Sequence, residues 1–328
     1  MTLTLPRLLF LLAILIAAAD TVWAAFAHFS IDIAAYGRLA LLALALFAAG
    51  LVYRKWRPDP ALEAMLMGTS FLLVFSAAAS VLNYFLLTVA GPRIDDLLVA
   101  ADRVLGFDWY QVMLAMAGHP HLNAVLFQVY NFVLPEIALL MVTLAWTGQP
   151  ERVYRFCLAV AVGALIAIFI WTCAPSLGAK SLYTLPDWAQ KRLVLSVTTQ
   201  YGRDLVALLH NGPGYITPND LRGLIAFPSY HVVLALVVAW HARKVVWLRW
   251  PLAAINLLVL VSTPIQGGHH LIDVIGAFPV AAAAIAIGES RKLTFVVKER
   301  LPEKIASVPT GPFRSAAGQE GTLEPLPD

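Results

Sequence analysis

The chain has 328 residues, of which 60% are apolar and 13% are charged, whereas roughly 25% are charged in an ordinary soluble domain. A mean hydropathy of +0.75 excludes a soluble enzyme, a disordered protein and a nucleic-acid binder. The net charge of +3 is too small to attract a polyanion. We therefore expect an all-α protein, a polytopic bundle of membrane helices that has no nucleic-acid partner.

Eight segments are predicted to span the membrane, because a spanning helix needs about 20 mostly apolar residues. They lie at about 8–27, 37–53, 65–90, 123–146, 153–174, 228–247, 250–265 and 269–288. The first could be a signal peptide, but the seven further segments favour an uncleaved helix. The predicted organisation is two N-terminal transmembrane helices at 1–60, a six-helix core at 61–289, and a basic, then disordered cytoplasmic tail at 290–328.

The distribution of lysine and arginine predicts the orientation. If the N-terminus is cytoplasmic, the basic groups at 54–57, 243–249 and 291–304 all lie in the cytoplasm, and the longer outside connections carry a lower density of positive charge. The prediction is a multi-pass protein, of a bacterial inner membrane, with both termini in the cytoplasm.

Two outside connections stand out. In the first, residues 91–122, apolar side chains recur at helical spacing from Ile94 to Leu105, and Asp95, Asp96 and Asp102 fall elsewhere on the helical wheel. This pattern predicts an amphipathic helix at the membrane interface. The second connection, 175–227, is the longest polar stretch, and long loops in compact proteins are often functional.

Two short motifs carry the chemistry, Phe227-Pro228-Ser229-Tyr230-His231 and Gly267-Gly268-His269-His270-Leu271-Ile272-Asp273. Each opens a predicted helix on the outside. Between them the chain crosses the membrane twice, so His231 and His269 return to the same face. Their separation in sequence therefore predicts proximity in space.

These residue types suit phosphoryl transfer. Asp273 lies four residues after His269, on the same helical face, where a carboxylate can orient one imidazole nitrogen and make the other more basic. A neutral, oriented imidazole can attack phosphorus, and His231 can hold a proton for the leaving oxygen. Ser229 and the adjacent helix N-terminus offer hydrogen-bond donors to a phosphate. No metal or cofactor is needed.

Two other interpretations remain open from the residues alone. One is a metal centre formed by a convergent set of donors, namely His231, His269, His270 and Asp273. The other is a non-enzymatic transporter or channel with an acidic path, because acids inside spans are costly and usually functional. The acids concerned are Asp20, Glu136 and Asp273.

The two motifs resemble those of the type-2 phosphatidic acid phosphatases, or lipid phosphate phosphatases, in the branch related to inositol phosphorylceramide synthase. The resemblance covers about residues 65–288. Pro228-Ser229-Tyr230-His231 stands where the family has Pro-Ser-Gly-His or Pro-Ser-Leu-His, and His269 with Asp273 meets its His-x-x-x-Asp pattern. The resemblance implies a lipid phosphate substrate among membrane lipids, His269 as a nucleophile that forms a phosphohistidine, Asp273 as its orienting acid, and His231 as the general acid.

The sequence departs from the family at its phosphate-binding cations. The family's first signature, a lysine followed after six residues by Arg-Pro, is absent, and Thr263 stands where an arginine often precedes the histidine. We expect Ser229, Lys180 and Arg222 to bind the substrate phosphate instead, since Lys180 and Arg222 are the loop cations nearest to the two motifs. The sequence indicates neither the acceptor, water or a hydroxyl, nor the oligomeric state.

Overall fold

The computed structural model describes residues 4–27, 29–212, 214–219, 221 and 223–290. Over these residues the expected all-α helix bundle is confirmed. The strands of the described part are β1 (Ser30–Ile31) and β2 (Tyr215–Ile216), which form one short parallel pair. Apart from Ser290, the predicted tail at 290–328 lies outside the described residues.

All eight segments expected to span the membrane contain helices. Five helices are long and apolar enough to cross: α1 (Leu5–Ala27), α2 (Ile33–Lys55), α3 (Pro60–Leu86), α8 (Pro150–Cys173) and α13 (Leu271–Gly288). A sixth span is broken, because α6 (Pro120–Asn131) and α7 (Val133–Trp146) meet at a bend of 46°. The remaining two are α11 (Tyr230–Ala242) and α12 (Arg249–Gln266). With 13 residues, α11 is shorter than a full crossing requires.

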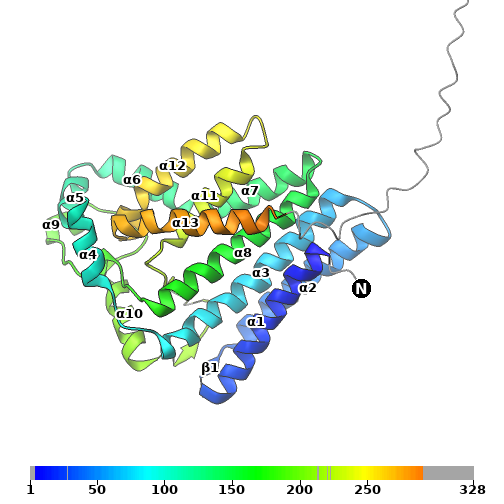
Figure 1. Ribbon diagram of the computed structural model, residues 1–328, viewed down its shortest axis with the longest axis horizontal. Coiled ribbons are helices and arrows are strands. Elements are labelled where there is room, and N and C mark those ends of the chain that lie inside the picture. Colours follow the sequence, from blue (N-terminus) through cyan, green and yellow to red (C-terminus); the bar gives the residue numbers. More distant parts are fainter. Residues whose placement is uncertain (1–3, 28, 213, 220, 222, 291–328) are drawn as a thin grey trace, which may run out of the picture. The chain divides into compact units, whose positions relative to one another are not determined.

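Helix α8 is the central element of the bundle. It packs against α3, α7, α11 and α13, and Figure 1 shows it running alongside α3 and α13. Small residues let these helices approach closely, as is usual in membrane bundles. A side chain at Gly163 would meet Val233 Cγ1 of α11 at 2.8 Å and Ala284 Cβ of α13 at 3.5 Å. The close approach of α11 to α8 therefore depends on this glycine.

Short elements gather where α13 begins, as Figure 1 shows for α4, α5 and α9. They are α4 (Asp95–Val104), α5 (Trp109–Ala117), α9 (Asp187–Gln190), α10 (Thr199–Asn211) and the 3₁₀ turns η1 (Leu87–Val89) and η2 (Ala179–Ser181). Helix α4 contacts α13, α5 contacts α12, and η2 contacts α10. These elements cover the ends of the helices that carry the two histidine motifs.

The predicted amphipathic helix exists as α4, and the structure shows which of its side chains face the protein. Asp95, Leu98 and Asp102 are the buried residues of α4, whereas Leu97 and Val104 are 65% and 88% exposed. The acids turn inward because each finds several hydrogen-bond donors in neighbouring loops, described below. The apolar side chains are left on the outer surface, where an interfacial helix meets lipid.

The close packing of α8 gives a prediction about stability. Gly163→Leu should lower the melting temperature of the purified protein in detergent, because overpacking of this kind costs about 1–3 kcal/mol. Gly37→Ala is the control, since nothing lies within 4 Å of a Cβ at that position of α2. An equal fall in melting temperature in both variants would show that the close packing at Gly163 of α8 does not contribute to stability more than other helix positions do.

Candidate functional site

The two histidine motifs meet around one cavity of about 320 Å³. Lys180, His231 and His269 all line it, together with Tyr130 and Tyr201. His231 lies in the first turn of α11, and His269 lies just before α13. The two helices start at the same end of the bundle because α12 returns the chain to the end where α11 began.

His269 is held by the acid that the sequence pairs with it. Its Nδ1 lies 3.0 Å from Asp273 Oδ2, and the same oxygen accepts the backbone N–H of His270 at 2.9 Å. Asp273 is fully buried in the first turn of α13. The spacing of four residues thus brings the pair together although His269 itself precedes the helix.

The second nitrogen of His269 faces Ser229. Its Nε2 lies 3.5 Å from the Ser229 hydroxyl, which is completely buried. The backbone N–H of Ser229 donates to the carbonyl of Asp273 at 3.1 Å, so the two motifs are joined directly. Burial and the neighbouring charge of Lys180 lower the pKa of His269 to about 3. The ring is therefore neutral, with a lone pair available on Nε2.

His231 is fixed by an aromatic partner that sequence reasoning missed. Its ring stacks on Tyr130 of α6, with ring centroids 4.3 Å apart and 13° between the planes. The Tyr130 hydroxyl also lies 3.3 Å from His231 Nδ1. No pattern in the sequence signalled this contact, because Tyr130 sits 101 residues away in a segment with no distinctive motif.

Lys180 lies in the cavity, where the sequence analysis expected a phosphate-binding cation. Its Nζ donates to the Gly267 carbonyl at 2.8 Å and lies 4.5 Å from the centroid of the Tyr201 ring. Gly268 has a φ of +65°, and a side chain there would collide with the Lys180 stem. Burial lowers the pKa of Lys180 to about 7.

Among the described side chains, Lys180 is the only cation of the 175–227 connection that lines the cavity. Arg222 lies outside the described residues, so its predicted role in phosphate binding stays a prediction. The side chain of Arg203 is likewise outside the described part. Lys191 and Arg192 are exposed and do not line the cavity.

Asp102 of α4 holds the loop that carries His269. Its Oδ2 lies 2.9 Å from His270 Nδ1, and its carboxylate accepts the backbone N–H groups of Leu271 and Ile272 at 3.3 and 3.0 Å. These are donors at the N-terminus of α13, which favours negative charge. His270 therefore points toward α4, while its neighbour His269 points into the cavity.

Asp95 on the same face of α4 holds the loop that carries Lys180. One of its oxygens accepts the Ser176 hydroxyl at 2.8 Å and the Leu177 backbone N–H at 2.9 Å. Asp95 and Asp102 are seven residues apart, which is about two helical turns. That spacing, with Leu98 between the acids, was the available signal, but the sequence did not indicate which loops the acids would contact.

The donors proposed for a metal centre do not converge. The described residues contain no group of three or more His, Cys, Asp and Glu side chains placed to hold one ion. His270 pairs with Asp102 and lines a different cavity from His231 and His269. The arrangement instead combines a neutral histidine, a second histidine and a buried lysine around a space for an anion.

Comparison with known proteins identifies the family of the chain. Residues 96–287 match the family model of the PAP2 superfamily, which is more than half of the chain. No curated protein and no solved structure matched the chain. The matched region includes α4 and both histidine motifs. The chain belongs to the PAP2 superfamily.

Proposed function

We propose that the protein is a metal-independent phosphatase or headgroup phosphotransferase that acts on a lipid phosphate through a phosphohistidine. Membership of the PAP2 superfamily supports a phosphatase-type activity in general, and the long apolar helices make the protein an integral, multi-pass membrane protein. One observation supports the more specific proposal of a phosphohistidine at His269. His269 is held by Asp273 with its Nε2 beside Ser229, in the cavity that Lys180 and His231 also line.

In the first step, the Nε2 lone pair of His269 attacks phosphorus. The N–P bond forms while the P–O bond to the leaving oxygen breaks, and His231 gives its proton to that oxygen. Asp273 stabilises the charge that develops on the His269 ring, and Lys180 with Ser229 binds the phosphate oxygens. Because His269 is neutral at the outset, no proton has to leave Nε2 before attack.

In the second step, a hydroxyl compound returns a proton to His231 and attacks phosphorus. The N–P bond breaks and His269 is regenerated. If the hydroxyl compound is water, the protein is a phosphatase; if it is a lipid or sugar alcohol, the protein is a transferase. The Pro-Ser-Tyr-His motif resembles the branch related to inositol phosphorylceramide synthase, which favours transfer.

The proposal includes a location for the chemistry. The distribution of lysine and arginine favours cytoplasmic termini in a bacterial inner membrane, with the site at the periplasmic face. We further propose that residues 61–289 form the catalytic core, to which residues 1–60 add two helices. The Arg222 side chain is proposed as a second phosphate contact.

The transporter hypothesis has less support, because its three acids occupy separate environments. Asp20 lines a cavity between α1, α2 and α3. Glu136 accepts a hydrogen bond from Asn256 at 2.8 Å, and Asp273 holds His269. In the described part of the chain, no cavity joins the three acids into a path.

The covalent intermediate is testable by trapping. Purified protein in detergent with a chelator should become labelled when it is mixed with ³²P-phosphatidic acid and quenched with base, because phosphohistidine survives base. We expect His269→Ala to lose both the label and at least 10³-fold in turnover. His231→Ala should be slowed less for substrates with good leaving groups, which need less protonation. Label retained in His269→Ala, or turnover abolished by the chelator, would contradict the mechanism.

The pH dependence of substrate binding should follow the protonation state of Lys180. Its pKa, lowered to about 7 by burial, means that the ammonium is present below pH 7 and is lost above it. We expect kcat/KM to fall as the pH rises from 7 to 9. In Lys180→Arg the cation persists over this range, so the fall should disappear relative to wild type. An unchanged pH profile in that variant would remove Lys180 from phosphate binding.

Asp102 should act by positioning His269. We expect Asp102→Asn to lower kcat about 10–100-fold, as losses of orienting groups do in comparable sites, with little change in KM. Asp96→Asn is the matched control, since Asp96 is exposed on the same helix. A melting temperature that falls without a change in kcat would indicate a merely structural role for Asp102.

A further inference from the structure

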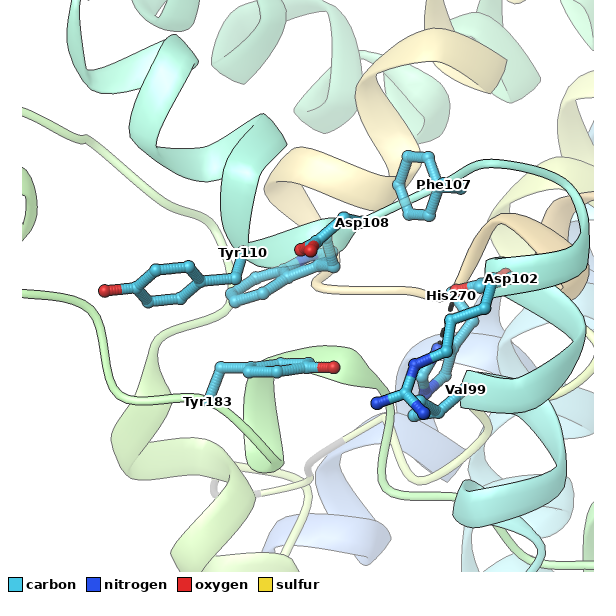
Figure 2. A pocket seen from close by; sticks show the side chains of 9 residues that line it. Val99, Asp102, Phe107, Asp108, Tyr110, Tyr183 and His270 are labelled. Carbon is cyan, nitrogen blue, oxygen red and sulfur yellow. Dashed lines mark hydrogen bonds and ion pairs between the residues drawn. The ribbon is translucent and has the colours of Figure 1, made fainter.

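A second cavity of about 300 Å³ lies beside the candidate site. The two are separated by the segment that contains the adjacent histidines and by the turn η2. His269 and Lys180 line the first cavity, whereas His270 and Tyr183 line the second. Figure 2 shows the second cavity between the loop that leads into α5, the Tyr183 ring and the Asp102–His270 pair. The proposed function assigns no role to this cavity.

One wall of the cavity is aromatic and rigid. The Tyr183 ring stacks on Trp109, with centroids 5.9 Å apart and 21° between the planes, and its centroid lies 6.1 Å from that of Tyr110. Trp109 is 3% exposed, and its indole N–H donates to the Pro264 carbonyl at 2.8 Å. The hydroxyl end of Tyr183 points toward the side of the cavity where His270 lies (Figure 2). This wall offers flat apolar faces whose positions are already fixed.

The opposite wall holds a buried polar atom that has no partner. His270 is 1% exposed, and its Nδ1 is occupied by Asp102. Its Nε2 is inaccessible to solvent and makes no hydrogen bond in the structure. Burial opposes protonation, but the hydrogen bond to Asp102 and the charges of Asp273 and Asp102 raise the pKa of His270 overall. A buried imidazole nitrogen without a partner is costly, whichever protonation state the ring adopts.

The charges of the lining residues decide which kind of ligand fits. A cationic ligand is opposed by the charge of Arg103, although aromatic faces alone would attract it. An anionic ligand is opposed by Asp102 and Asp108. A neutral ligand rich in hydroxyls suits both the basic and the acidic lining residues, because hydroxyl groups donate to carboxylates and accept from guanidinium and imidazole. Its C–H faces would pack on the aromatic wall.

We propose that this cavity binds a neutral polyhydroxylated ring, such as a hexose, either free or as the headgroup of a lipid. The ring lies against Tyr183, the guanidinium of Arg103 donates to one of its hydroxyl oxygens, and the carboxylate of Asp108 accepts from another. Binding at this cavity is separate from the proposed catalysis. A test of sugar binding therefore supports or overturns this proposal whether or not a phosphohistidine forms.

Saturation-transfer NMR on the full-length protein tests the proposal. The protein is kept in a polyoxyethylene detergent, because maltoside headgroups would compete for the cavity. Glucose and octyl glucoside are the probes, and choline is tested in parallel. We expect magnetisation to be transferred from the protein to the ring protons of these sugars. A signal from octyl glucoside alone would assign the ring to a lipid headgroup, and a signal from glucose shows that a free sugar suffices.

Three variants locate the site. Tyr183→Leu, Asp108→Asn and Arg103→Gln should each reduce the glucoside signal at least fivefold, whereas Asp187→Asn should leave it unchanged. Asp187 is an exposed acid in α9 that does not line the cavity, and asparagine at position 108 can still cap α5. The proposal is overturned if neither sugar gives a signal, if choline gives a signal in their place, or if the signal persists in Arg103→Gln and Asp108→Asn.

Discussion

The candidate site depends on two carboxylates carried by one short helix. Asp95 and Asp102 lie on the same face of α4, and each accepts hydrogen bonds from a different loop. One loop carries Lys180 and the other carries His269. Buried carboxylates are stable only when such donors surround them, so α4 and the two loops can pack only in this relation. The relative positions of Lys180 and His269 therefore depend on a short helix that lies outside both motifs.

Much of this arrangement could be predicted from the sequence because it rests on local rules. Apolar segment length identified the helices, two crossings brought the ends of the motifs together, and the four-residue spacing paired His269 with Asp273. The inward face of α4 was missed because periodicity treats every aspartate as polar surface, and only the partner loops make Asp95 and Asp102 interior residues. The stacking of Tyr130 on His231 is a tertiary contact with no local signature.

The environment of Lys180 explains why its cavity suits an anion. The ammonium is buried, and its closest recorded partners are neutral, a carbonyl of Gly267 and the ring of Tyr201. These groups stabilise the charge only partly, which is why burial brings the pKa down to about 7. A phosphate would supply the missing negative charge and restore the proton. On the proposed function, this charge, which within the fold is compensated only partly and in part by Asp273, would bind the substrate phosphate.

Adjacent histidines give the two cavities a common wall. Consecutive side chains in an extended segment point in opposite directions, so His269 and His270 face different spaces while sharing one backbone. The Asp102 carboxylate that fixes His270 also caps α13, whose first turn carries Asp273. A ligand that orders His270 on one side would therefore stabilise the loop that holds His269 on the other. Because the coupling runs through hydrogen bonds to a single carboxylate, it requires no movement of the transmembrane helices.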